Sequence, residues 1–547
     1  MTEVEPRLVD TGRGYTITYR GKTLYSPRDP RAGAIRRVEK ITFEPKTLVF
    51  IPSLGLGYGI PELLDRIPDS CHILCIEVDE RLFKLALSAG PALPKSNRLT
   101  IIRTAQPKQA AAVAQKLGLW RFRRLLPLHL SGGYQLYRRE YRELQEILEE
   151  EIRLFWQNKL TLVTMAHLWL KNLFTNLRFL PAAGDISELS TNRPMLVAGA
   201  GPSLEKSLDW IARIRKQIIL MAVDTSLPVL SEAGLLPDWV FTLDAQIYTV
   251  LDFIPCRDPR IKLLCDLTSN PQSLRLFPEL FFFSTRFHPL QLFDRLEAAG
   301  LLPTPLHPRG SVGVSAVEAA LLITKGPVLF TGLDFSYPRG QPHARGAPSQ
   351  RAMHFECTRT QPCGMSAFEA LLARPRLWLD GKRGKRLLTD LVLHSYARQL
   401  HNIIAGSPRT FDLGPEGLPV GAQKIHSFSE LAQICIPSPS RGSRGRIEAG
   451  RRSARDRKGR VGQVRSFCEN EQSLVSEVVQ KLAEPGRQEA DRLHPLFEAV
   501  EYLLLSLPEV NPEKVLTSQD LKTVNARARL FSSHMQRTCK ALVRCGP

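Results

Sequence analysis

Residues 195 to 206 read Met195-Leu-Val-Ala-Gly-Ala-Gly-Pro-Ser-Leu-Glu-Lys206, and this stretch decides the fold. Its first four residues are apolar and predict a buried strand, and the residues from Pro202 onward predict the start of a helix. Gly199 and Gly201 stand between the two elements, where glycine permits a sharp turn and a close approach of the backbone to a ligand. Because the free N–H groups of a helix start attract phosphate, we predict a nucleotide-binding loop made of Gly199, Gly201, Pro202 and Ser203.

Three further apolar segments each end in an aspartate, namely 218–224, 239–244 and 328–334. A Gly-rich stretch, 309–313, precedes the last of them and is followed by a short predicted helix. Ligands of open α/β sheets lie beyond the carboxyl ends of the strands, so one cleft can collect all of these segments. A single aspartate of this kind fits a helix cap, but the set favours a shared site. We predict that this site includes Asp224, Asp244, Asp334, Gly310, Ser311 and Gly332.

The order of these motifs resembles the central domain of the motility-associated factor (Maf) family of flagellin glycosyltransferases, which also carries a 6-hydroxymethylpterin pyrophosphokinase MptE-like label. The motifs are G-x-G-P-S-L, A-V-D-T, P-D-x-x-x-x-L-D, G-S-V and G-L-D-F-S-Y, within about residues 160 to 425. The Gly-Pro-Ser-Leu loop is also similar to that of the family 42 sialyltransferases. The resemblance implies transfer of a nonulosonic, sialic-like acid from a CMP-activated donor, a nucleotide sugar, to Ser/Thr side chains of flagellin.

The resemblance also implies which residues carry the chemistry. The segment after Asp334 is similar to the D-L-x-Y…T-H-A-x-G element of Maf proteins, which marks Asp334, Tyr337 and His343 as catalytic. Two roles stay open for His343: it contacts the donor phosphate, or it serves as the base, since a neutral imidazole can take the proton of an attacking hydroxyl. His354 is the rival base, in a segment that we expect to be irregular and to act as a lid.

Two other functions stay open. A 6-hydroxymethylpterin diphosphokinase would use ATP and Mg²⁺, with the aspartates as metal ligands, although the extensions on both sides of the central domain count against a compact pterin enzyme. A non-catalytic flagellar assembly factor would keep the nucleotide fold without its chemistry. Two departures favour it: Ala200 stands where the sialyltransferase loop has Asn, and Asp412 stands where Maf proteins have Asn.

The N-terminal part predicts a second α/β unit. Thr47–Gly59 is a strand that runs into a G-x-G-x-G turn, and His72–Glu77 is a strand that ends in a carboxylate able to reach a ribose. Ser53 replaces the acid that methyltransferases carry before the first glycine, so we predict a structural Rossmann-like fold. Asn172 and Asn176, one helical turn apart, are expected to anchor a loop.

Composition sets the domain organisation. The chain has 547 residues, 43% of them hydrophobic, and can bury several cores. Residues 441–465 hold ten Lys or Arg, which predicts a basic disordered linker. We predict an α/β protein with five parts: a Rossmann-like domain (1–130), a helical connector (131–180), a sialyltransferase-like α/β domain (181–430), the linker (431–469) and a helical domain (470–547).

Several classes of protein are excluded by the sequence. The net charge of +20 is largely local and lacks interleaved aromatic residues, so we expect no nucleic-acid partner. We expect no membrane span and no signal peptide, and therefore a cytoplasmic protein. The ten cysteines lack zinc-site spacing, and the sequence decides neither metal dependence nor oligomeric state.

Overall fold

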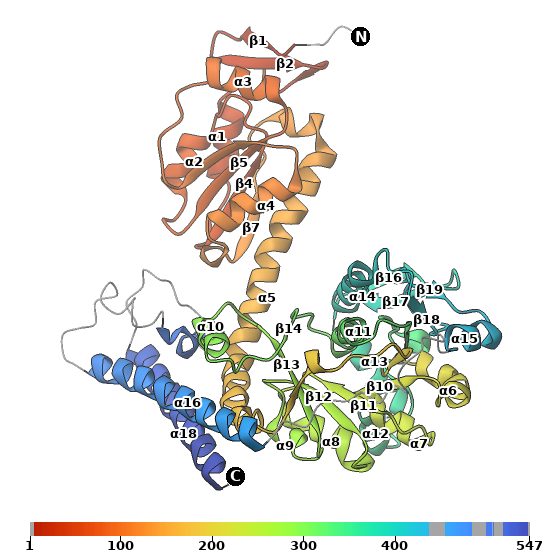
Figure 1. Ribbon diagram of the computed structural model, residues 1–547. Helices are drawn as coiled ribbons and strands as arrows, with labels where there is room; N and C mark the ends of the chain where they lie inside the picture. The colour runs from red at the N-terminus through yellow and green to blue at the C-terminus, as the bar shows by residue number, and fades with distance from the viewer. Residues whose placement is uncertain are drawn as a thin grey trace. The chain divides into compact units, whose positions relative to one another are not determined.

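The computed structural model describes residues 5–360, 362–372, 374–436, 454–483, 499–505, 507 and 518–544 (Figure 1). The chain forms two compact units, Met1–Thr164 and Met165–Pro547. One helix of 39 residues, α5 (Arg138–Asn176), contributes to both units. It lies within the residues of the predicted helical connector and is a single helix. The central and C-terminal domains that we predicted separately belong to one unit.

Unit 1 contains the predicted Rossmann-like sheet. Its four strands are parallel in the order β6-β5-β4-β7, and a small antiparallel sheet, β1-β2-β3, packs beside them. Apolar clusters cover both faces of the parallel sheet, as parallel sheets require. The elements are β1 (Arg7–Asp10), β2 (Tyr15–Tyr19), β3 (Lys22–Thr23), α1 (Ala32–Glu39), β4 (Thr47–Pro52), α2 (Ile60–Arg66), β5 (His72–Glu77), α3 (Glu80–Ala89), β6 (Leu99–Arg103), α4 (Pro107–Lys116) and β7 (Arg124–Pro127).

Unit 2 is built on a ten-stranded sheet in the order β14-β13-β12-β11-β10-β9-β15-β18-β19, with β8 beside β13. From β9 the chain winds outward to β14 and then returns to the other side of β9 as β15, so the topological switch point lies between β9 and β15. The strands are β8 (Gly184–Asp185), β9 (Met195–Ala198), β10 (Ile219–Val223), β11 (Trp239–Thr242), β12 (Lys262–Asp266), β13 (Leu280–Thr285), β14 (Pro305–Leu306), β15 (Val328–Thr331), β18 (Thr410–Asp412) and β19 (Gln423–Lys424).

The strand pairs of the ten-stranded sheet are parallel, as is typical of sheets that helices cover on both faces. Every residue of β9, β10 and β11 is buried, and α11 packs its small apolar residues on the same core. A two-stranded antiparallel hairpin, β16 (Arg376–Asp380) and β17 (Arg386–Asp390), is added after α13. The helices are α6 (Ser203–Ile214), α7 (Leu227–Glu232), α8 (Val250–Phe253), α9 (Pro271–Leu274), α10 (Gln291–Ala298), α11 (Val312–Ile323), α12 (Pro348–Phe355), α13 (Cys363–Leu372), α14 (Leu391–Ile404) and α15 (Phe428–Ile434).

The C-terminal region is helical, as predicted. Its described residues include helix α18 (Ser518–Arg544) and a short 3-10 turn, η9 (Glu501–Leu503). The predicted disordered linker is wrong at both ends of its range. Helix α15 reaches into its start, and α16 (Ala454–Ala483) begins inside it because Val464 and Phe467 are buried in the packing against α18. Residues 437–453 of the linker lie outside the described residues.

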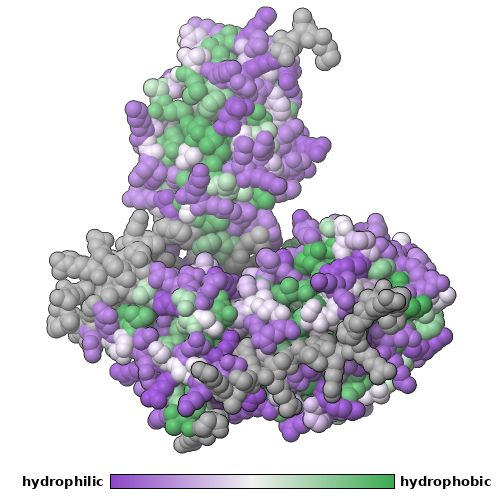
Figure 2. Space-filling model, in the orientation of Figure 1, coloured by the Kyte–Doolittle hydropathy of each residue, from purple (hydrophilic) through white to green (hydrophobic). Residues whose placement is uncertain are grey.

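The surface in Figure 2 is mostly hydrophilic on the face shown, with smaller apolar patches on both units. Within the described part of the chain, no helix combines the length and the apolar character that a membrane span requires.

Candidate active site

The predicted nucleotide loop leaves β9 at the switch point and packs against the loop that follows β15. The Gly199 N–H donates to the Thr331 carbonyl at 2.8 Å, and the Gly201 N–H donates to the Gly332 carbonyl at 2.8 Å. A Cβ at Gly199 would lie 2.5 Å from the Gly332 oxygen, and Gly332 itself has a φ of +68°. The glycines that we predicted to admit a ligand therefore allow one backbone to approach another.

The start of α6 already has an anion of its own. Asp334 Oδ2 accepts a hydrogen bond from the Ser203 N–H at 2.9 Å, and both residues are buried. Asp334 Oδ1 is also buried and has no hydrogen-bond partner among the described residues. Burial raises the pKa of Asp334 to about 6, while the Ser203 hydrogen bonds and Lys382 oppose the rise. The Ser203 N–H at the start of α6 is therefore taken by the Asp334 carboxylate, while donor binding by the rest of the loop stays a prediction.

A buried ion pair that the sequence analysis missed lies next to this carboxylate. Lys382 Nζ, from the turn between β16 and β17, lies 2.7 Å from Asp412 Oδ2, and both side chains are 4% exposed. Lys382 also donates to the Gly414 carbonyl at 3.2 Å. Asp412, where Maf proteins have Asn, could have indicated this ion pair in the sequence, because a buried carboxylate needs a cation nearby.

Asp224 and Asp244 follow β10 and β11 and reach the predicted edge of the sheet. Asp224 is buried and accepts hydrogen bonds from the Thr242 hydroxyl and the Thr225 N–H, both at 2.8 Å. Asp244 is half-buried and is the most accessible of the three predicted aspartates. Asp252 in α8 is a third carboxylate close enough to feel both charges. Its burial, followed by the charges of Asp224 and Asp244, raises its pKa to about 7. Asp252 is not among the predicted site residues.

Tyr337 follows the carboxyl end of β15 and is bound to another side chain. Its hydroxyl donates to Asp390 Oδ2 at 2.6 Å, and burial, followed by this hydrogen bond, raises the pKa of Tyr337 to about 12. Asp390 in turn caps α14 through the Val392 and Leu393 N–H groups. This hydrogen bond ties Tyr337 to the end of the β16–β17 hairpin, and its catalytic role stays a prediction.

His343 lies beside the predicted loop. The N–H of the next residue, Ala344, donates to the Ala200 carbonyl at 2.8 Å. His343 Nδ1 is 3.0 Å from the Ser349 hydroxyl, and burial lowers the pKa of the imidazole, which keeps it neutral near pH 7. An ion pair at 2.9 Å between Arg345 and Glu205 fastens this segment to α6. His343 thus has the protonation state that a general base requires.

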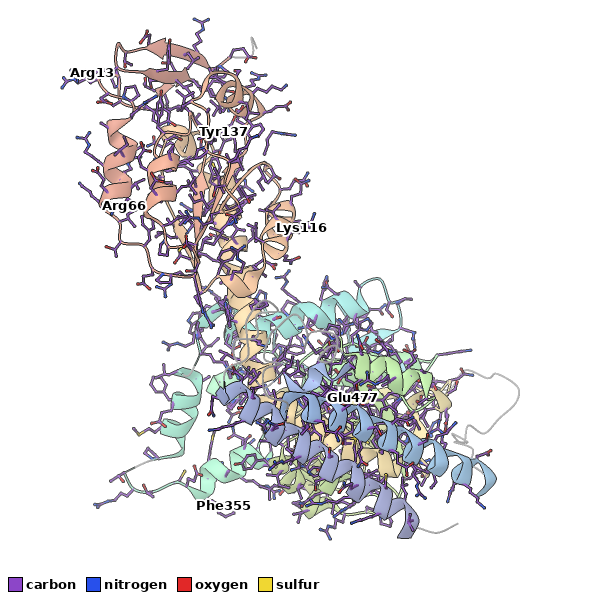
Figure 3. All side chains as sticks on the ribbon, turned by 90° about the vertical axis from the view of Figure 1, so that its left-hand side faces the viewer. Arg13, Arg66, Lys116, Tyr137, Phe355 and Glu477 are labelled. Carbon is purple, nitrogen blue, oxygen red and sulfur yellow. The ribbon has the colours of Figure 1, made fainter. Side chains whose placement is uncertain are left out.

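His354 is exposed and lies in α12, so the predicted irregular lid is a helix at this point. The next residue, Phe355, is 88% exposed and is labelled in Figure 3. Gly310 adopts a φ of +70° against the Tyr396 ring, and the Ser311 hydroxyl accepts the Val314 N–H as the cap of α11. Gly310 and Ser311 therefore serve the local fold of the loop before α11.

The Gly-rich loop of unit 1 is organised in the same way. Glu77 is buried at the end of β5 and accepts hydrogen bonds from the Ser53 and Tyr141 hydroxyls and from the Leu54 N–H. Its carboxylate is therefore committed to the loop, which corrects the predicted ribose contact and supports a structural fold. In unit 2, Asn172 donates to the carbonyls of Ala245 and Thr268, and Asn176 to those of Leu267 and Ser269, which confirms their predicted role as loop anchors.

Across the ranges that the structure describes, no group of three or more His, Cys, Asp and Glu side chains is placed to hold a metal ion.

Comparison with known proteins agrees with this architecture. Residues 168–340 match the family model of the 6-hydroxymethylpterin diphosphokinase MptE-like domain. An uncharacterised protein of Treponema pallidum is 32% identical over 444 residues, which cover 78% of this chain and 76% of the relative. A second one from the same organism is 29% identical over 105 residues, covering 19% of this chain and 50% of that protein.

The fold is similar to the solved structure of a Maf glycosyltransferase from Magnetospirillum magneticum AMB-1. The TM-score is 0.55 at 15% identity, over 100% of this chain and 92% of that protein. The chain therefore belongs to one family with the longer-matching Treponema pallidum protein, contains an MptE-like domain and has the fold of a Maf glycosyltransferase.

Proposed function

We propose that this chain is a Maf-type glycosyltransferase that moves a nonulosonic acid from a CMP-activated donor to Ser/Thr side chains of flagellin. The observation that carries the proposal is the extent of the fold likeness, which covers the whole chain and not only the MptE-like domain. The presence of further parts on both sides of the MptE-like domain favours a protein acceptor, because a small soluble substrate needs no such platform.

The donor would bind at the carboxyl edge of β9, β10 and β11. Asp244 is accessible there and would accept hydrogen bonds from ribose hydroxyls, while Asp224 and Asp334 hold the loops. If the proton of the neutral His343 imidazole sits on Nδ1, toward the Ser349 hydroxyl, Nε2 is an acceptor. The hydroxyl oxygen of Ser or Thr would attack the anomeric carbon, the bond to the CMP oxygen would break, and Nε2 would take the hydroxyl proton.

Transfer in vitro tests the proposal. Purified chain, a CMP-nonulosonate and unmodified flagellin are incubated together, and the flagellin is analysed by mass spectrometry. We expect modification by the wild type and a loss of roughly 10²–10⁴-fold in rate for His343→Ala. His354→Ala, which changes an exposed histidine of the same segment, is the matched control and should keep its rate. Equal losses in the two variants would remove His343 from the mechanism.

The MptE-like match keeps one second candidate, a diphosphokinase that acts on 6-hydroxymethylpterin with ATP and Mg²⁺. The same preparation is tested with these substrates, and AMP formation is measured. Pterin-dependent AMP formation, together with no transfer from CMP donors, would replace the proposed function.

A further inference from the structure

Unit 2 contains a basic cavity that none of the predicted donor-binding or catalytic residues lines. Its volume is about 710 Å³, within the ordinary range for small-molecule sites. Three walls enclose it: the C-terminal end of α5, the segments that follow β11 and β12, and α18. The lining side chains that matter for charge are Lys171, Arg178, Arg275, His534 and Arg537.

The charge in this cavity has one sign. Four Lys or Arg residues line it, and no Asp or Glu is among the lining residues. Lys171 and Arg178 are half-buried, while Arg275 and Arg537 are exposed at the rim. Cations gathered around a concave surface repel one another and attract a multiply charged anion, which would relieve the repulsion.

The walls are held together by specific hydrogen bonds. The Thr538 hydroxyl of α18 donates to the Phe174 carbonyl of α5 at 2.7 Å. Asn172 and Asn270 both donate to the Ala245 carbonyl, which fixes the segment after β11. The cavity is therefore a built feature of unit 2 that joins the C-terminal helix to the carboxyl edge of the sheet.

His534 reports the positive potential inside. Its Nδ1 lies 3.0 Å from the Thr175 hydroxyl, which itself donates to the Lys171 carbonyl at 2.7 Å. Thr175 therefore accepts from Nδ1–H of a neutral ring. Burial, followed by the charges of Lys171, Arg537 and Arg178, lowers the pKa of His534 to about 4. An imidazole that burial and three neighbouring cations together hold neutral is the behaviour expected of a side chain in a site for anions.

We propose that this cavity binds a small polyanion that carries phosphate groups. Arginine favours phosphate because its planar guanidinium donates two parallel hydrogen bonds to phosphate oxygens, and three of the four cations are arginines. Tyr248, 72% exposed in the lining, offers a ring on which an organic part of the ligand can stack. This site does not depend on the proposed transferase function. It would give α18, the C-terminal helix, a role in ligand binding.

Calorimetry with inorganic pyrophosphate and the full chain tests this site. The double variant Arg275→Gln/Arg537→Gln removes two rim charges, and Lys216→Gln/Lys325→Gln removes the same charge from exposed positions that do not line the cavity. We expect binding by the wild type that weakens between about 50 and 200 mM salt. The rim variant should lose at least about tenfold in affinity, and the control should stay within about twofold.

A second measurement does not depend on a substitution. Pyrophosphate should protect Lys171 from an acylating reagent in the wild-type chain, as read by peptide mass spectrometry. Absence of pyrophosphate binding, equal affinity in the rim and control variants, or acylation of Lys171 unaffected by pyrophosphate would each overturn the proposal. Failure of flagellin modification with intact pyrophosphate binding would count against the proposed function alone.

Discussion

Replacing Asp334 by asparagine tests whether the buried carboxylate at the switch point is structural. Asparagine keeps an oxygen that can accept the Ser203 N–H and removes the charge. Burial raises the pKa of Asp334 to about 6, from an ordinary value near 4. The folded chain thus holds this proton more tightly than the unfolded chain does. The ionised carboxylate therefore costs stability above pH 6, and this cost fades as the pH falls toward 4.

The size of the effect follows from the shift. A pKa raised by two units lowers the free energy of unfolding by roughly 2–3 kcal/mol at pH 8, where Asp334 is ionised. At pH 4.5 about half of this destabilisation or less remains. The stability of Asp334→Asn minus that of the wild type should therefore increase by about 2 kcal/mol from pH 4.5 to pH 8. Urea unfolding of both proteins across this range measures it, and other titrating groups contribute equally to both.

A pH-independent difference between the two proteins would refute the argument for a buried, ionising Asp334. The same variant separates structure from catalysis, because a positioning carboxylate can be replaced by its amide with little loss of rate. If Asp334→Asn loses as much activity as His343→Ala while staying folded, Asp334 acts on the substrate.

Three further predictions follow from the buried contacts. Gly201→Val would force its Cβ into the Asp334 carboxylate, so we expect unit 2 to misfold, as seen by loss of near-ultraviolet circular dichroism; a folded variant that only loses donor binding would support the original nucleotide loop instead. Lys382→Met should destabilise unit 2 by roughly 3–5 kcal/mol because it strands the Asp412 charge, and adding Asp412→Asn should recover most of that loss in urea unfolding; no recovery would contradict the ion pair. Glu77→Gln should destabilise unit 1 by about 1–3 kcal/mol, measured as an earlier unfolding transition, and an unchanged transition would argue that its hydrogen bonds are dispensable.

Much of the fold was predictable because its signals are local. Strands such as β9 and β10 are uninterrupted apolar runs, which is typical of parallel strands buried on both faces. Helix α18 follows from apolar residues at helical spacing. The basic composition before α18 predicted a disordered linker, whereas helix α16 begins at Ala454. Buried contacts stabilise this helix, and a count of charges does not reveal them.

The site was less predictable because its contacts are distant in sequence. A Gly-rich loop has the same local sequence whether a ligand or another loop approaches it, and Ser203 and Asp334 are 131 residues apart. Lys382 lies in a charged turn that reads as a solvent-exposed hairpin, and only the fold brings it to Asp412. Lys171, Arg275 and Arg537 come from three separate segments, so no motif marks the basic cavity.

The pairing of β9 with β15 also bears on how the chain folds. During synthesis β9 to β14 emerge first. One edge of the apolar strand β9 therefore has no hydrogen-bonding partner strand until β15 is made. Parallel pairing over so long a separation is slow, and an unpaired apolar edge invites association with other chains. The N-terminus of α6 likewise waits for its cap, since Asp334 is made 131 residues after Ser203. The switch point between β9 and β15 is therefore completed late in folding. A chain that ends before β15 would contain the β9 to β14 side of the sheet with an unpaired apolar edge, which is prone to aggregate.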